Sequence, residues 1–76
     1  MNAKDRKKVS EWIDTLIDMK AEIENMQEDQ QEKYDNLPEG LQDSEKGEAL
    51  EEAANTLEEV SDSVDSAIES LQEIAG

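Results

Sequence analysis

The chain has 76 residues, no cysteine and no histidine, and its 22 acids against seven cations give a formal net charge of −15. Disulfides and thiolate metal sites are therefore excluded, and a zinc site would need carboxylates alone, which is unusual. A body this acidic repels nucleic acid and anionic lipid head groups and attracts basic surfaces. No stretch approaches the roughly 18 apolar residues of a membrane span, and no targeting segment is evident, so we expect a soluble protein.

The charge is unevenly distributed along the chain. Four of the seven cations, Lys4, Arg6, Lys7 and Lys8, lie in the first eight residues. From Val9 onward three lysines face 21 acids, because only one of the 22 acids precedes that point, and the net charge of this part is −18.

The first predicted helix covers about residues 4–34. Apolar residues recur there at alternating steps of three and four, which is typical of a heptad seam on one helix face. We predict that this seam consists of Val9, Trp12, Leu16, Met19, Ile23 and Met26. Ile13 and Ile17 widen the stripe, and a wide stripe can touch more than one neighbouring helix. The residues expected to contact the core or a second copy of the chain are Trp12, Ile13, Leu16 and Ile17.

A turn is predicted over residues 35–43. Pro38 disfavours helical geometry at Leu37, and Asn36 and Gly40 tolerate unusual backbone angles. We expect Leu37 and Leu41 to fold inward and close this end of the molecule.

The second predicted helix covers about residues 44–75, with Asp43 or Ser44 as its N-terminal cap. Its apolar residues repeat over four heptads, which strongly predicts a helical seam. One set of seam positions holds Leu50, Leu57, Val64 and Leu71, the other holds Ala53, Val60, Ala67 and Ile74, and the flanking positions hold Ala54, Ile68 and Ala75.

These elements predict an all-α single domain, residues 1–76, folded as an antiparallel two-helix hairpin of the coiled-coil type. In that arrangement Lys4, Lys7 and Lys8 would lie beside Glu69, Glu73 and the C-terminal carboxylate. Two helices alone leave much apolar surface in water, and a chain this short has a marginal core. We therefore expect a homodimer that forms a four-helix bundle.

Catalysis and metal binding are not supported by the sequence. The serines of the second helix have no histidine base, so that no nucleophilic triad is available. An EF-hand loop also fails in both glycine registers, since Gly47 would place Gln42 at the first ligand position and Gly40 would place Leu37 at the third. The chain is therefore predicted to be no enzyme, with no cofactor and no metal.

The acids of the second helix form a stripe. On helical spacing its members share one outward face over 18 residues, or roughly 27 Å. Duplex DNA carries one phosphate charge per ~3.4 Å along each strand, so the stripe is sparser but similar in sign and linear form. Runs of charge usually serve solubility, although the rarity of lysine here favours a binding role. The expected binding residues are Glu51, Glu58, Asp62, Asp65 and Glu69, with Glu28 and Glu32 from a second cluster that also contains Glu22, Glu24 and Asp29.

The segment from Tyr34 to Ala49, YDNLPEGLQDSEKGEA, and the Glu-rich heptads that follow it resemble short uncharacterised proteins of bacteriophages and prophages. The resemblance covers about half of the chain, from Tyr34 onward. It implies a phage protein in the cytoplasm of a bacterial host, without implying an activity. Small acidic phage proteins often resemble inhibitors of host defence, including anti-CRISPR and anti-restriction DNA mimics.

The leading functional hypothesis is a non-enzymatic inhibitor whose acidic face binds a basic, nucleic-acid-binding host protein. The alternative is a structural or adaptor coiled coil of phage assembly that binds a partner helix through its apolar seam. A third reading, sequestration of a small nucleotide between subunits, would depend on the cations Lys4, Arg6, Lys7 and Lys8. No direct contact with nucleic acid or membrane is expected.

Overall fold

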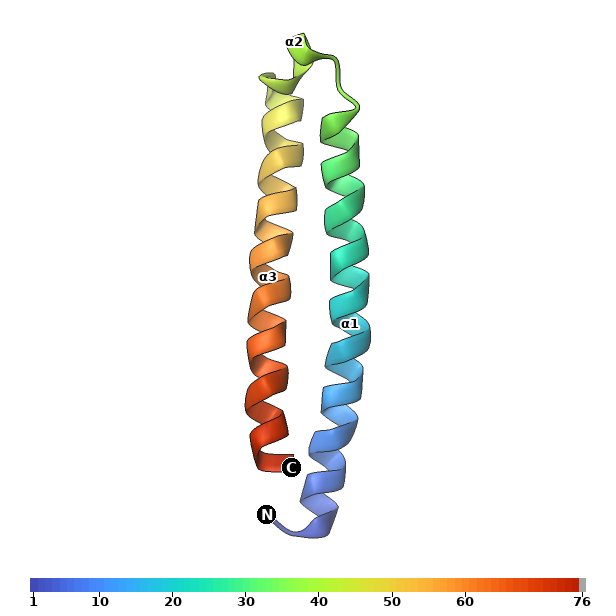
Figure 1. The fold of residues 1–76 in the computed structure, drawn as a ribbon, viewed down its shortest axis with the longest axis vertical. Coiled ribbons are helices and arrows are strands. Elements are labelled where there is room, and N and C mark those ends of the chain that lie inside the picture. Colours follow the sequence, from blue (N-terminus) through green and yellow to red (C-terminus); the bar gives the residue numbers. More distant parts are fainter. Residues whose placement is uncertain (76) are drawn as a thin grey trace.

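The computed structural model describes residues 1–75, which fold into two long helices joined by a short one. Helix α1 is Ala3–Asp35, α2 is Glu39–Gln42 and α3 is Glu45–Ala75. Helices α1 and α3 run antiparallel and side by side, with α2 at one end and both chain ends at the other (Figure 1). The molecule is a rod of 58 × 14 × 13 Å. The predicted all-α hairpin is therefore confirmed, while its pairing with a second copy stays a prediction.

The two long helices begin at capping residues. The Asn2 side chain accepts a hydrogen bond of 2.8 Å from the Asp5 backbone N–H at the start of α1. At the start of α3, the Ser44 hydroxyl accepts one of 3.3 Å from the Gly47 N–H, which makes Ser44 the cap among the two predicted candidates. Such caps satisfy backbone donors that have no partner within the helix.

The turn is more ordered than the sequence predicts. Residues 39–42 form the single helical turn α2, and no residue in the described part of the chain has a positive φ. Leu37 is half-buried as expected, but Leu41 is 51% exposed, so the prediction that both leucines close this end is wrong for Leu41. The helical geometry of α2 directs Leu41 outward, and Gln42 turns inward instead. Its amide nitrogen donates to the Tyr34 and Leu37 carbonyls, at 3.4 Å each.

On α1, three of the six predicted seam residues face α3, and at the other three places the next residue along the chain faces α3 instead. Val9, Leu16 and Ile23 do face α3, but Trp12, Met19 and Met26 are 53%, 46% and 52% exposed. The less exposed positions of α1 are Val9, Ile13, Leu16, Lys20, Ile23, Gln27, Gln30 and Tyr34. Those of α3 are Gly47, Leu50, Ala53, Ala54, Leu57, Ser61, Val64, Asp65, Ile68, Leu71 and Ala75.

The same shift occurs in α3, where Ala54 and Ile68 are buried while Val60 and Ile74 are 40% and 51% exposed. Two heptad patterns coexist in each helix, because the apolar stripe is wider than one seam. In the structure, the pattern that contains Ile13 lies between the helices, even though it also places Lys20 and Gln27 there. The predicted set at Ala53, Val60, Ala67 and Ile74 therefore borders the seam instead of filling it.

The best-packed part of the seam lies near the chain ends. Val9, Ile13 and Ile68 are 1%, 8% and 6% exposed and form one buried cluster. Leu16, Val64, Leu71 and Ala75 pack against this cluster. Toward the turn the seam contains Gln27 and Gln30, so apolar burial is concentrated at the end opposite α2.

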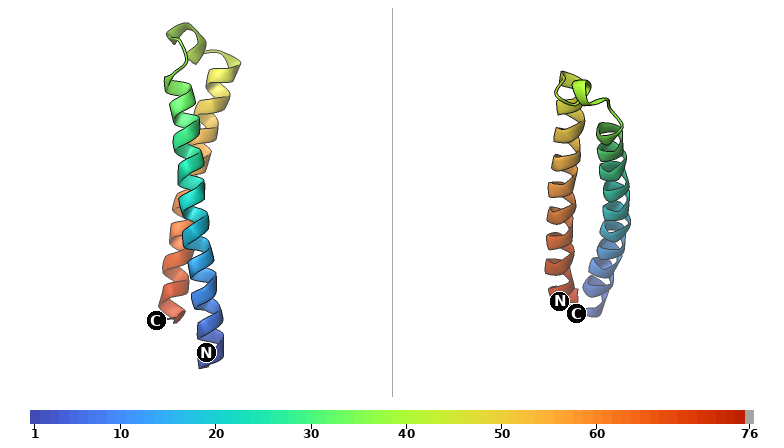
Figure 2. Two further views of the ribbon diagram at one scale, coloured as in Figure 1. Left: turned by 90° about the vertical axis from the view of Figure 1, so that its right-hand side faces the viewer. Right: turned by 45° about the horizontal axis from the view of Figure 1, so that its top comes forward.

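The basic N-terminal segment does not form the predicted pairs with α3. Between residues 1 and 75, the ion pairs are those of Lys20 and Lys33, and none joins Lys4, Lys7 or Lys8 to Glu69 or Glu73. Their predicted approach to the C-terminal carboxylate lies outside the described residues. No helix in residues 1–75 combines the length and apolar character needed to cross a membrane. The crossing of α1 and α3 in Figure 2 resembles that of two supercoiled helices.

Candidate functional site

The acidic stripe of α3 lies on one side of the seam. Glu51 and Glu58 each directly follow a seam leucine. Asp62 directly follows the buried Ser61, and Glu69 directly follows the buried Ile68. Residues that follow seam positions and residues that precede them lie on opposite flanks of a helix. All members of the stripe are exposed except Asp65, which is half-buried, so the structure brings the predicted α3 residues onto one accessible face.

Lys20 connects this face to α1. Its ammonium nitrogen lies 3.1 Å from an Asp65 carboxylate oxygen and 3.5 Å from one of Glu24. The Ser61 hydroxyl donates to the same Glu24 carboxylate at 3.3 Å. The hydrogen bond to Asp65 is the largest cause of a raised pKa of Lys20, with the charges of Asp65 and Glu24 adding to it and desolvation opposing it. Asp65 is therefore partly neutralised, and the exposed charge of the stripe resides mainly in the other four acids.

The second predicted cluster, on α1, is less coherent. Glu28 and Glu32 are one helical turn apart and both are exposed. Asp29, however, forms an ion pair with Lys33 at 3.1 Å, and Glu24 forms one with Lys20 at 3.5 Å. The five acids of this cluster are thus distributed around the helix, and only Glu28 and Glu32 remain as an outward pair.

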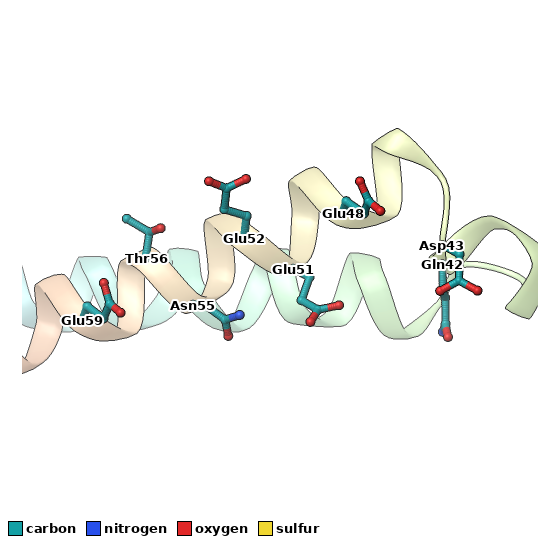
Figure 3. A pocket seen from close by; sticks show the side chains of 8 residues that line it. All are labelled: Gln42, Asp43, Glu48, Glu51, Glu52, Asn55, Thr56 and Glu59. Carbon is teal, nitrogen blue, oxygen red and sulfur yellow. The ribbon is translucent and has the colours of Figure 1, made fainter.

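A further acidic groove, which the sequence did not reveal, lies where the turn meets α3 (Figure 3). It has a volume of about 530 Å³ and no cationic residue lines it. Its lining residues are Gln42, Asp43, Glu48, Glu51, Glu52, Asn55, Thr56 and Glu59. The turn brings Gln42 and Asp43 next to α3, a proximity that no periodic pattern encodes.

Gly47 makes this close approach possible. A Cβ atom at this position would lie 2.7 Å from the Leu41 carbonyl oxygen and 2.6 Å from the Gln42 carbonyl carbon, too close for any side chain. The glycine was the available sequence signal, although its role is visible only once α2 is placed. Nearby, a hydrogen bond to Glu51 is the largest cause of a raised pKa of Tyr34, with desolvation and the charges of Glu51, Asp43 and Asp35 adding to it.

The predicted contact residues of α1 separate into three environments. Ile13 is buried in the seam and Leu16 is half-buried beside it. Trp12 and Ile17 are 53% and 47% exposed, and they lie on opposite flanks, because one precedes and the other follows the seam. Contact of these residues with a second copy stays a prediction, but Ile13 has its partner within the chain.

An apolar flank is defined here by the residues that precede the seam in both helices. Its apolar members are Trp12, Met19 and Met26 of α1 and Ala53, Val60, Ala67 and Ile74 of α3. Toward the turn the same positions hold Lys33 and Lys46, which line one groove. In an antiparallel pair these positions fall on the same side of the hairpin. The structure agrees, since Met26 and Ala53 line one groove of about 550 Å³ with Gln30, Ala49 and Leu57.

No group of three histidine, cysteine, aspartate or glutamate side chains within residues 1–75 is arranged to hold a metal ion. The arrangement instead offers two extended surfaces, one acidic and one apolar, on different sides of the rod. No protein-family model, no curated protein and no solved structure matches this chain.

Proposed function

We propose that this chain is a non-enzymatic phage protein that binds a basic surface of a host nucleic-acid-binding protein through the acidic stripe of α3 and thereby inhibits it. The phage and host context comes from the sequence resemblance. The observation that carries the proposal is the segregation of charge in α3, which holds ten acids and one lysine. None of these acids holds a position of the apolar flank, although Glu52 lines the groove beside it, and Lys20 of α1 neutralises only Asp65 and Glu24.

The stripe suits a groove that normally holds a nucleic-acid backbone. Its exposed carboxylates follow one uninterrupted helix, so that they present negative charge in a row, as a phosphate backbone does. A charged rod of this kind would be steered to a basic groove, and added salt would weaken the association. The acidic groove beside Asp43 and Glu59 extends the negative surface toward the turn.

The proposal can be tested by capture from lysate of the bacterial host, followed by affinity measurement with the captured protein. The test variant is Glu58→Gln/Asp62→Asn/Glu69→Gln, which leaves the Lys20–Asp65 pair intact. We expect its affinity to fall at least about tenfold, from three charges contributing roughly 0.5 kcal/mol each. Duplex DNA should also displace the captured protein.

A matched control is available on α1. Glu11→Gln/Asp18→Asn/Glu22→Gln removes the same number of charges from exposed positions away from the stripe. This control should lose less than about threefold in affinity. Equal losses in both variants would mean that only net charge matters, and unchanged affinity in the stripe variant at low salt would refute the proposed charge mimicry.

A second candidate function is supported by the exposed apolar flank. A structural or adaptor protein would use Trp12, Met19 and Met26 to bind a partner helix, with the acids serving solubility. In that case Met19→Glu would abolish partner binding, and the stripe variant would have little effect. Ile13 is unsuitable for this test, because it is a core residue. We further propose that the hairpin dimerises into a four-helix bundle, as the narrow seam and the exposed flank both favour.

A further inference from the structure

The apolar flank is large for a surface that faces water. Trp12, Met19 and Met26 are 53%, 46% and 52% exposed, and Val60 and Ile74 are 40% and 51% exposed. At roughly 200 Å² per side chain, these five residues expose on the order of 500 Å² of apolar surface. That area is at the upper end of the largest patch found on ordinary monomers, and patches of this size commonly mark interaction sites.

The surroundings of the flank on α3 carry little charge, although Glu52 lines the same groove as Met26 and Ala53. The next positions outward are all small and uncharged, namely Ala49, Thr56, Ser63 and Ser70. One side of the rod, 58 Å long and 14 Å wide, offers about 800 Å², which is what each partner contributes to a stable standard interface. A surface that is apolar along most of the rod, with charges at its edges and near the turn, therefore suits another helical rod.

From this we infer that the occupant is a second copy of the chain, which packs its own apolar flank against this one with its turn at the opposite end. The inference rests on the proposed dimerisation and deepens it by naming the face and the orientation. A two-fold contact of this kind is isologous, so the same residues are covered in both copies. The result is a four-helix bundle in which α1 lies against α1 of the partner.

The charge at the edge of the flank favours this orientation. On α1 the bordering residues are Lys8 near the chain ends, Thr15 and Glu22 in the middle, and Asp29 near the turn. If Met19 lies on the two-fold axis, the seven-residue spacing places Trp12 against Met26 of the partner subunit. The same axis places Lys8 beside Asp29 of the partner subunit, which also pairs with Lys33 of its own chain at 3.1 Å, so that opposite charges meet at both ends of the contact between the two α1 helices.

The alternative orientation, with both turns at the same end, lacks this complementarity. It would place the acidic turn regions of the two copies next to each other, with Asp35, Glu39, Asp43, Glu45 and Glu48 in each. Like charges in close contact are destabilising.

Cysteine cross-linking tests the face and the orientation together, because the chain has no native cysteine. Met19→Cys and Ile17→Cys are matched variants, since the two positions are 46% and 47% exposed but lie on opposite flanks. A disulfide requires Cα atoms within about 7 Å, which in this arrangement only position 19 satisfies across the two-fold axis. Under mild oxidation, Met19→Cys should give a covalent dimer at least about tenfold faster than Ile17→Cys.

Sedimentation equilibrium of the unmodified chain separates the possible failures. A monomer at micromolar concentration overturns both the dimerisation and this inference. A dimer that cross-links through position 17, or through neither position, overturns the named face or orientation and leaves dimerisation intact. Lys8→Glu should weaken the dimer and a second change, Asp29→Lys, should restore it; failure of this rescue also counts against the antiparallel orientation. The acidic-stripe variants should leave the dimer unchanged, so their binding test is independent.

Discussion

Two glycines seven positions apart should respond in opposite ways to the same substitution. Gly40 lies in α2, where a Cβ atom would meet nothing within 4 Å. Gly47 is buried at the start of α3, where a Cβ atom would collide with the backbone carbonyl groups of Leu41 and Gln42. Gly40→Ala and Gly47→Ala therefore add the same methyl group to helical residues in open and in closed surroundings.

The magnitude follows from two opposing effects. Alanine stabilises a helical position by up to about 1 kcal/mol relative to glycine. At Gly47 this gain is opposed by forced displacement of backbone, which costs typically about 1–3 kcal/mol or more. The neighbouring atoms have little freedom to move, because the Ser44 N–H donates to the Leu41 carbonyl at 3.1 Å and the Glu48 N–H donates to the Ser44 carbonyl at 2.9 Å. We expect Gly47→Ala to lose about 1–2 kcal/mol net and Gly40→Ala to gain about 0.5 kcal/mol.

Thermal unfolding followed by circular dichroism measures both effects. One kcal/mol corresponds to about 4–8 °C in Tm for a domain of this size, so Gly47→Ala should lower Tm by roughly 4–16 °C and Gly40→Ala should raise it by a few degrees. Measurements should be made at equal protein concentration, since dimerisation would make Tm concentration-dependent. If Gly47→Ala were as stable as the parent chain, α2 would not lie against α3 as described, and the acidic groove would lose its geometric basis.

The remaining predictions concern titration and the core. The raised pKa values of Tyr34 and Lys20 mean that the folded chain holds both protons more tightly than the unfolded chain, so their stabilising effect is complete below about pH 10 and is lost as the pH rises through the raised values. Because Tyr34 is the only tyrosine, its ultraviolet titration can be followed directly, and Glu51→Gln should lower its pKa; an unchanged titration would contradict the assigned contact. Val9→Ala should destabilise the hairpin by about 2 kcal/mol, since Val9 is 1% exposed, whereas Ile17→Ala should cost less than about 1 kcal/mol; equal effects in denaturant unfolding would argue against the observed seam.

Periodicity alone predicted the number, type and direction of the long helices. The repeat of leucine and valine at positions 50, 57, 64 and 71 is typical of a helix with one apolar face, and the segment around Pro38 separates the two long helices. The predicted helix bounds, residues 4–34 and 44–75, differ from the observed ones by one residue at three of the four ends and agree at the fourth, Ala75. The acidic stripe was also predictable, because helical spacing fixes which residues of one helix share a face.

The choice between two adjacent heptad patterns was not predictable from hydrophobicity. Met19 and Met26 are better seam residues by composition than Lys20 and Gln27, yet the latter face α3. Packing of two helices is decided along the whole interface at once, and the pattern containing Ile13 also brings Ala54, Ser61 and Ile68 between the helices. The small side chains of Ala54 and Ser61 leave room for the longer side chains of α1.

The sequence by itself determined that this chain forms two acidic, amphipathic helices joined by a turn, because local spacing and charge are properties of each segment alone. The tertiary structure decided which stripe is buried, which lies exposed as the apolar flank, and how α2 closes against Gly47. Those outcomes depend on contacts between residues far apart in the chain, and the free energies of competing registers differ by the fit of many side chains together.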